Sequence, residues 1–466
     1  MIKRVNNKRI PKRVLIAGKG LAGTTLAHDV SDAGDTVVGF LDDIVVDADV
    51  LGTLADVAVV CAAEKVDVVY FAIPSASAEV VRAFVSRVPR PSVELAIVPR
   101  TYRIVSRDRV SVNDLTDVDV LDFVGRAPVK HDMDVAREQL RGSTVMVTGA
   151  AGSIGSRVVG QLAALEPERI IGVDRSESSV FHLGMTMADE SRVQLEIGDV
   201  QSEERIAQLM TRYMPDFVFH VAAYKHVPLM QANPLEAFNN NVWGTLNVMR
   251  AAEKHGVRRA VYVSTDKAVN PTNVMGATKR LGELLIRELG VSGATTSFSA
   301  VRFGNVLESE GSVMQIFRRQ LAAGKHLTVT HPDITRFFMT IDEAAQLIIQ
   351  TASLGKNGDL FVLDMGEPIR VLDLAQGLIT ATNPTLSVDI VGLRPGEKMY
   401  EELSYSASDI DRTSHPKIMV VKEHELSATA RTTEWIESLL PQTRSYTISD
   451  STLVGALREF GFDAIQ

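Results

Sequence analysis

Short apolar runs rich in β-branched residues recur along the chain, and amphipathic stretches separate them. In the first part of the sequence these runs cover residues 13–17, 37–41, 68–73 and 93–98. A second series covers residues 144–148, 169–174, 217–223 and 259–264. Such runs are typical of strands buried on both faces of a parallel sheet, and their alternation with helical stretches favours parallel pairing. The pattern therefore predicts an α/β protein in which one architecture occurs twice.

Each series opens with a glycine-rich turn between its first strand and the following helix. The first turn carries Gly18, Gly20 and Gly23 in the spacing G-x-G-x-x-G, and the next strand ends in Asp42 and Asp43. This combination is the fingerprint of a dinucleotide site with an acid for the ribose. A second interpretation stays open, because the same glycines also permit a tight turn and close helix packing without a ligand.

The second glycine turn has the spacing G-x-x-G-x-x-G and predicts a functional dinucleotide site. The residues expected at the pyrophosphate, beside the helix N-terminus, are Gly149, Gly152, Ser153, Ile154 and Gly155. Asp174 ends the next strand, where a carboxylate accepts from the ribose 2′-hydroxyl and repels a 2′-phosphate. It therefore favours NAD over NADP, although the adjacent Arg175 weakens that preference. The residues expected to flank the adenine and the ribose are Asp199, Val200, Ala222, Ala223 and Tyr224.

These two glycine turns predict two Rossmann-like, doubly wound parallel-sheet domains. We expect the first at residues 1–105 and the second at residues 142–466. Residues 106–141 are charged and poorly periodic, so they are expected to form a connector with room for one short helix.

Between residues 264 and 279, a strand end and a helix start bring reactive groups together. Thr265, Asp266 and Lys267 place a hydroxyl, a carboxylate and an amine side by side where the strand ends. The following helix would carry Met275 and Lys279 on one face, because residues four apart are neighbours on a helix. Open α/β sheets bind ligands at the carboxyl ends of their strands, so this stretch predicts an active site. The alternative is a solvated loop followed by a surface helix.

Composition narrows the class of partner. The chain has 466 residues and a net charge of −9, which argues against nucleic acid or an anionic membrane as its main partner. Its one cysteine, Cys61, fits a reducing compartment, and its ten histidines lack metal-ligand spacing, so no metal is expected. No apolar run approaches the roughly 20 residues of a spanning helix. The basic residues 3–13 are expected to form a solvated tail rather than a signal peptide, and the protein is expected to be soluble and cytoplasmic.

Longer blocks of sequence extend these motifs. They comprise residues 148–155, 220–230, 240–245, 264–273, 329–332, 336–340 and 392–398. Together they resemble the extended short-chain dehydrogenase/reductase family, and within it the polysaccharide-biosynthesis type of UDP-N-acetylglucosamine 4,6-dehydratase. The resemblance covers about residues 12–420 and implies an NAD-binding core with a smaller C-terminal part for the nucleotide sugar. Membrane-bound members carry transmembrane helices ahead of the first nucleotide fold, so we expect a soluble or trimmed two-domain form, and a homo-oligomer.

The resemblance implies a three-stage reaction on a UDP-sugar. NAD⁺ removes hydride from C-4, water leaves across C-5 and C-6, and the hydride returns to C-6. Asp266 is expected to protonate the C-6 oxygen and Lys267 to take the C-5 proton; both roles need shifted pKa values, and an aqueous ion pair is the alternative. Thr265 would hydrogen-bond the 4-hydroxyl, and Lys279 would bind the nicotinamide ribose.

The substrate side is expected beyond residue 302. Asn305, Arg336 and Arg394 resemble residues that contact the diphosphate, a task that suits the arginine fork. Glu397 would accept from the uridine ribose, and surface ion pairs are the alternative for these residues. Two further residues would line the sugar pocket or belong to a structural loop, namely Lys225 and His226.

Two departures from the family pattern keep other functions open. Met275 stands where most relatives carry the tyrosine of Y-x-x-x-K, and a thioether can neither accept nor donate that proton. Met-bearing relatives are associated with retention at C-5; the base for the 4-hydroxyl would be a relayed water or Asp266 acting twice. Glu308 and Glu310 add acids near the expected diphosphate. The alternatives are a C-4 epimerase, a dehydratase of another nucleotide sugar, or a catalytically degenerate dinucleotide-sensing protein.

Overall fold

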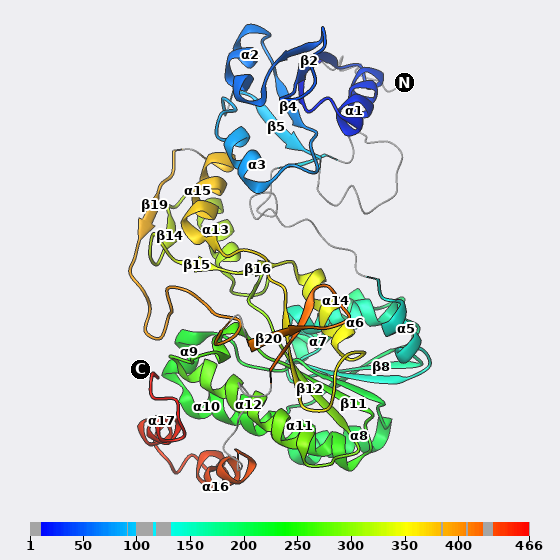
Figure 1. The fold of residues 1–466 in the computed structure, drawn as a ribbon, viewed down its shortest axis with the longest axis vertical. Coiled ribbons are helices and arrows are strands. Elements are labelled where there is room, and N and C mark those ends of the chain that lie inside the picture. The colour runs from blue at the N-terminus through cyan, green and yellow to red at the C-terminus, as the bar shows by residue number, and fades with distance from the viewer. Residues whose placement is uncertain are drawn as a thin grey trace, which may run out of the picture. The chain divides into compact units, whose positions relative to one another are not determined.

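The computed structural model describes residues 11–90, 92–98, 115–117, 132–383, 385–406, 409–422 and 432–465. The chain divides into two compact units (Figure 1). Unit 1 comprises Met1–Lys130, Phe317–Val329 and Val371–Ile390, and unit 2 comprises His131–Ile316, Thr330–Arg370 and Val391–Gln466. Basic residues 3–10 and most of the connector predicted at 106–141 lie outside the described residues, so the predicted domain boundaries stay a prediction.

Unit 1 is built on a six-stranded sheet in the order β3-β2-β1-β4-β5-β6, parallel except for β6. Its strands are β1 (Arg13–Ala17), β2 (Thr36–Leu41), β3 (Val50–Gly52), β4 (Val68–Phe71), β5 (Glu94–Ile97) and β6 (Thr116–Asp117). Its first helices are α1 (Leu21–Asp32), α2 (Val57–Ala63) and α3 (Ala78–Val85). β1 is central, and its apolar side chains from Val14 to Ala17 are fully buried, as the sequence pattern requires. The predicted Rossmann-like sheet is confirmed.

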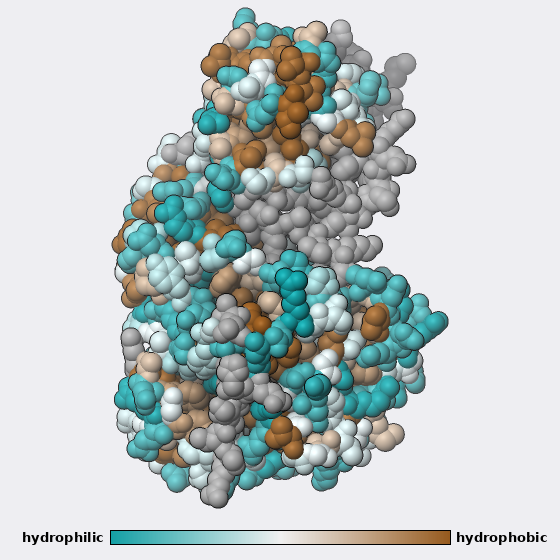
Figure 2. All heavy atoms as spheres, viewed as in Figure 1, coloured by the Kyte–Doolittle hydropathy of each residue, from teal (hydrophilic) through white to brown (hydrophobic). Residues whose placement is uncertain are grey.

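Residues from later in the chain complete unit 1. Helix α15 (Val371–Thr382) lies against α3, and β14 (Leu327–Val329) pairs in parallel with β19 (Val388–Ile390). Unit 1 also leaves large apolar side chains in solvent (Figure 2), among them Leu21 and Val46 at 81% and 98% exposure. These side chains are not among the buried residues of unit 1, one cluster of which comes mainly from β1, β2, β4 and α1.

Unit 2 contains a nine-stranded sheet in the order β20-β21-β17-β12-β11-β10-β7-β8-β9. Its parallel strands are β7 (Thr144–Thr148), β8 (Arg169–Asp174), β9 (Val193–Ile197), β10 (Phe217–His220), β11 (Arg259–Val263), β12 (Ser297–Arg302) and β17 (Asp359–Leu363). Two antiparallel strands extend one edge, β20 (Ile410–Arg412) and β21 (Ile418–Val421). The strand order reverses at β7, between β8 and β10, which is where doubly wound sheets bind nucleotides.

Helices cover both faces of this sheet. One face packs against α5 (Asp134–Leu140), α6 (Ser153–Ala163) and α14 (Ile341–Thr351). The other packs against α8 (Glu203–Tyr213), α11 (Gly244–Lys254) and α12 (Val274–Val291). The remaining elements are α7 (Glu177–Thr186), α9 (Val227–Ala232), α10 (Pro234–Phe238), the π-helix η4 (Asn239–Trp243), α13 (Val313–Ala322), α16 (Thr432–Arg444), α17 (Asp450–Glu459), and the short strands β13 (Asn305–Val306), β15 (Thr335–Arg336), β16 (Phe338–Met339) and β18 (Ile369–Arg370). The predicted α/β class with two parallel-sheet domains is confirmed.

Helix α12 is buried along most of its length. It starts after Asn273, a residue type favoured at helix N-caps, whose side chain accepts a hydrogen bond from the amide of Gly276. One face of α12 meets the sheet, and the other forms a third core with α10, η4, α16 and α17. Its side chains from Val274 to Ile286 are therefore all buried, including the charged Lys279, Arg280 and Glu283.

Among the described residues, none of the helices combines the length and the apolar composition that crossing a lipid bilayer requires.

Candidate active site

The glycine turn after β7 forms a narrow backbone cradle. Gly149 has a φ of +70°, and a Cβ at this position would lie 2.6 Å from the backbone N and Cα of Ala222. A Cβ at Gly155 would lie 2.0 Å from the carbonyl oxygen of Gly149. Helix α6 begins here with Gly152 as its N-cap, so no capping side chain covers its first amide groups. The turn therefore leaves room and donors for a diphosphate.

Asp174 ends β8 beside this cradle. Its Oδ2 accepts a hydrogen bond from the amide of Ala151 at 3.1 Å, and its Oδ1 accepts one from the amide of Ser176 at 3.0 Å. The guanidinium of Arg175 lies 4.4 Å from the centre of the Tyr224 ring and 3.9 Å from Asp199 Oδ2. The carboxylate is thus fixed at the end of the sheet where the sequence predicts the ribose, and these residues fit a dinucleotide.

One cavity of about 560 Å³ in unit 2 collects nearly every predicted site residue. On the cofactor side its lining includes Gly149, Gly152, Ser153, Ile154, Gly155, Asp174, Arg175, Asp199, Val200, Ala222, Ala223 and Tyr224. The other predicted residues in its lining are Lys225, His226, Thr265, Lys267, Met275, Lys279, Asn305, Arg336, Arg394 and Glu397. Asp266 alone among the predicted residues does not line the cavity, since its side chain is fully buried behind the cavity wall.

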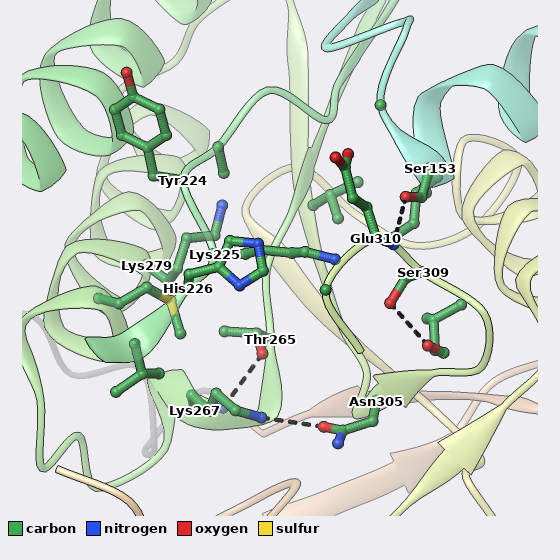
Figure 3. Close-up of a pocket in the computed structure, with 18 of the residues that line it drawn as sticks. Ser153, Tyr224, Lys225, His226, Thr265, Lys267, Lys279, Asn305, Ser309 and Glu310 are labelled. Carbon is green, nitrogen blue, oxygen red and sulfur yellow. Dashed lines mark hydrogen bonds between the residues drawn. The ribbon is translucent and has the colours of Figure 1, made fainter. Parts of the chain in front are cut away.

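The amine of Lys267 lies in a polar cluster, and Figure 3 shows its contact with Asn305. It donates to Asp266 Oδ1 at 2.9 Å and to Asn305 Oδ1 at 3.2 Å, and it lies 3.5 Å from Glu401 Oε1. Burial lowers the pKa of Lys267, but the carboxylates of Asp266 and Glu401 outweigh it, so the pKa is raised overall. This direction favours an ammonium over the free amine that a base for the C-5 proton requires.

Thr265 caps the short turn that carries this cluster. Its Oγ1 donates to Asp266 Oδ1 at 3.0 Å and accepts from the amide of Lys267 at 3.5 Å. Thr265 also lines the cavity, so its second lone pair can accept a hydrogen bond from a ligand hydroxyl. The expected contact with a sugar hydroxyl is compatible with this geometry.

Lys279 lies deeper, one turn beyond Met275 on α12. Its Nζ is 4.2 Å from the centre of the Tyr262 ring, and burial lowers the pKa of Lys279 to about 7, against a smaller opposing effect of Glu283. Glu283 is held by Ser264, Arg302 and Arg280, so it does not pair directly with Lys279. Met275 is 3% exposed, lines the cavity and packs into the core that α12 shares with α10 and η4, and its thioether can neither accept nor donate a proton.

Some hydrogen-bonding groups of the residues predicted to bind the diphosphate already bind other parts of the chain. Arg336 donates to the carbonyl oxygens of Lys398 at 2.7 Å and Met399 at 3.1 Å, and its Nη2 lies 3.5 Å from Glu397 Oε1. The amide of Arg394 donates to Glu397 Oε2 at 3.1 Å. Arg336 therefore holds the loop that carries Glu397 and Glu401 as well as lining the cavity.

The loop bearing the two unexpected acids crosses the glycine turn. The amide of Glu310 donates to Ser153 Oγ at 3.0 Å (Figure 3). Burial lowers the pKa of Lys225, and the nearby Glu310 partly offsets this effect. Burial also lowers the pKa of His226, with Lys225 adding to the decrease. The carboxylate of Glu310 therefore offsets the positive charge of Lys225. This pairing of charges accounts for an acid beside a site that is predicted to bind an anion.

Sequence reasoning missed two groups of residues in this site. Glu401 lines the cavity from a loop with no periodicity. The buried Tyr262 and Glu283 both act on Lys279, the first from β11 and the second from α12, the helix that carries Lys279 itself. One local indication of Glu401 was present in the sequence: two adjacent acids, Glu401 and Glu402, closely follow the family-like block at residues 392–398. Glu283 follows Lys279 by four residues on α12, a helical spacing, but no linear spacing connects Glu401, Arg302 or Tyr262 with the predicted residues.

Comparisons with known proteins agree with this fold. The family model described as "Polysaccharide biosynthesis protein" matches residues 145–423. Capsular polysaccharide biosynthesis protein CapD of Staphylococcus aureus is 39% identical over 417 residues, covering 86% of this chain and 69% of that protein. UDP-N-acetylglucosamine 4,6-dehydratase (inverting) of Campylobacter jejuni is 34% identical over 264 residues, covering 56% and 77%.

A solved structure, that of Pen from Bacillus thuringiensis, superposes with a TM-score of 0.58 at 34% identity, covering 61% of this chain and 90% of that one. The family match spans more than half of the chain, and CapD is similar along most of its own length. The chain therefore belongs to the polysaccharide biosynthesis protein family.

Proposed function

We propose that this chain is an NAD-dependent UDP-N-acetylglucosamine 4,6-dehydratase that retains the configuration at C-5. The observation that carries the proposal is the cluster of Lys267 with Asp266 and Glu401, beside the cavity that also holds the glycine turn and Lys279. A 4,6-dehydration needs a proton acceptor at C-5 and a proton donor at the C-6 oxygen. A C-4 epimerase needs neither. Both reactions need a base at the 4-hydroxyl, which Met275 cannot provide, so this step does not separate them.

NAD would be held by the glycine turn, the first amides of α6 and Asp174, and it would supply the hydride acceptor and donor. The carboxylate of Asp174, fixed by two backbone amides, would accept from the adenosine ribose. Lys279, which the fold buries on the same side of α12 as Met275, would contact the nicotinamide ribose. These residues leave the cluster at Lys267 free to act on the sugar.

The nucleotide sugar would extend from this cluster toward Asn305, Arg394 and Glu397, all of which line the same cavity. Lys225 and His226 would face the sugar from the opposite wall. The relative from Campylobacter jejuni that is named a UDP-N-acetylglucosamine 4,6-dehydratase supports this substrate class. Met275 supports the C-5-retaining subset over the inverting one.

A proton NMR time course with UDP-N-acetylglucosamine tests the proposal. A dehydratase converts the 6-hydroxymethyl group to a methyl group, so a new 6-methyl signal should appear as substrate is consumed. The coupling pattern at C-5 of the product should report the configuration of the starting sugar. Formation of a C-4 epimer without a methyl signal, or no turnover by protein that carries bound NAD, would reject the proposed activity.

A further inference from the structure

The loop that follows β13 places an acid beside the predicted cofactor site. We propose that Glu310 competes with the diphosphate of NAD for the ammonium of Lys225 and thereby sets how tightly this chain holds NAD. This inference rests on the dinucleotide site of the proposed function, and it applies whichever sugar reaction takes place there. Lys225 would then serve the cofactor as well as the sugar, and Glu310 would act on the cofactor mainly through Lys225.

The loop lies against the glycine turn. The amide of Glu310 donates to Ser153 Oγ at 3.0 Å (Figure 3), and Ser153 is the first residue of α6 after its N-cap, Gly152. Residues 309–312 line the cavity together with Gly152 and Ser153. The first amides of α6 are the donors expected to bind the cofactor's diphosphate, so this diphosphate would have Glu310 as a neighbour.

The same loop packs on the residues that follow β10. Gly311 has a φ of +68°, and a Cβ at this position would lie 2.3 Å from His226 Cε1, so the loop backbone packs closely against the imidazole. Burial lowers the pKa values of Lys225 and His226, and the carboxylate of Glu310 opposes the decrease in both. Glu310, Lys225 and the start of α6 therefore share one part of the cavity.

Both charged groups remain available to a ligand. Among the described residues, neither the ammonium of Lys225 nor the carboxylate of Glu310 forms a hydrogen bond or an ion pair. Both side chains are exposed where they line the cavity. An ammonium has three donors and no acceptor, so a phosphate group is a suitable partner for Lys225. Glu310 is the acid whose charge acts on this ammonium before such a partner binds.

Competition follows from the signs of these charges. Without a ligand, the carboxylate of Glu310 attracts the ammonium of Lys225. When a diphosphate binds to Lys225, this attraction is weakened, and the like charges of Glu310 and the diphosphate repel each other. Both effects lower the affinity for NAD. Because Glu310 is exposed, water and salt screen part of the repulsion, and we expect a loss of affinity of about three- to tenfold.

Calorimetric titration of NAD into the full chain, freed of cofactor, compares Glu310→Gln with Glu308→Gln. Glu308 belongs to the same loop, but it does not line the cavity, so its substitution removes the same charge away from Lys225. Glu310→Gln should bind NAD about three- to tenfold more tightly than wild type. Its affinity should also fall more steeply with added salt, because the site has lost a negative charge. Glu308→Gln should match wild type in both respects.

Replacement of Lys225 establishes whether Glu310 acts through this residue. Lys225→Met should weaken NAD binding, and in this background Glu310→Gln should change the affinity by less than it does in wild type. Equal effects of Glu310→Gln with and without Lys225 would overturn the inference, as would an unchanged affinity in Glu310→Gln. Since Glu310 is exposed, Glu310→Gln should unfold in guanidinium at the same concentration as wild type, so a gain in affinity would not reflect a more stable fold.

A titration with UDP in place of NAD separates the two diphosphates that the proposed function brings into the cavity. Wild type and Glu310→Gln should bind UDP with similar affinity. Tighter binding of UDP without tighter binding of NAD would assign Lys225 to the nucleotide sugar and overturn the inference. Absence of NAD binding in both wild type and Glu310→Gln would instead reject the dinucleotide site, and with it both the proposed function and this inference.

Discussion

Replacement of Lys279 by methionine should stabilise unit 2, and the gain should depend on pH. Lys279 is buried with its Nζ over the Tyr262 ring, and Glu283, its potential partner, is bound to Arg302 and Arg280. Burial lowers the pKa of Lys279 from 10.5 to about 7. The folded chain therefore binds the proton more weakly than the unfolded chain does, and methionine removes this penalty while keeping a side chain of similar length.

The size of the effect follows from the shift in pKa. Below about pH 7 the ammonium is buried in the folded state, so the penalty is complete and amounts to about 5 kcal/mol. As the pH rises from about 7 toward 10.5, the folded chain loses the proton first, and the stability of the wild type increases by about 1.4 kcal/mol per pH unit. Near pH 9 the remaining penalty is about 2 kcal/mol. Loss of the contact with Tyr262 reduces the gain by about 1 kcal/mol.

Unfolding in guanidinium followed by tryptophan fluorescence measures this difference. The chain has two tryptophans, and both Trp243 and Trp435 pack in the core that α12 helps to form, so the signal reports on unit 2. Lys356→Met, which removes an exposed ammonium, serves as the control and should show no pH-dependent gain. A stability difference between Lys279→Met and wild type that stays constant from pH 7 to about pH 10 would refute the reasoning.

Three other substitutions have defined outcomes. Glu283→Gln leaves the fully buried Arg302 without its carboxylate, which should lower the free energy of unfolding by about 3–5 kcal/mol in the same fluorescence assay. Gly149→Ala places a Cβ 2.6 Å from the backbone of Ala222 at a positive φ, so purified protein should carry little NAD in its absorbance spectrum while Gly142→Ala, whose Cβ meets nothing within 4 Å, should keep it. Asp174→Ala removes the acceptor for the ribose and should weaken NAD by at least about tenfold in a calorimetric titration, whereas unchanged affinity would place the ribose elsewhere.

The strands, helix starts and glycine turns of this protein were predictable from the sequence, because interactions between residues close in the chain determine them. The buried strands β1 and β7 follow from apolar runs of residues, and the start of α12 follows from the capping side chain of Asn273. The glycine turn at Gly149 needs a positive φ and an empty Cβ position, a requirement that a sequence motif records directly. These features fix the parallel sheets, and with them the end of the sheet at which ligands bind.

Tertiary structure alone decided which charged groups face one another. Asp266 and Lys267 are neighbours in sequence, but in the folded chain the first is fully buried while the second lines the cavity. Glu401 joins them from a distant loop held by Arg336, and Glu283 meets Arg302 from a different element. A pKa depends on burial and on charges within a few ångströms, which no linear spacing encodes, so the roles of these groups depend on the folded chain.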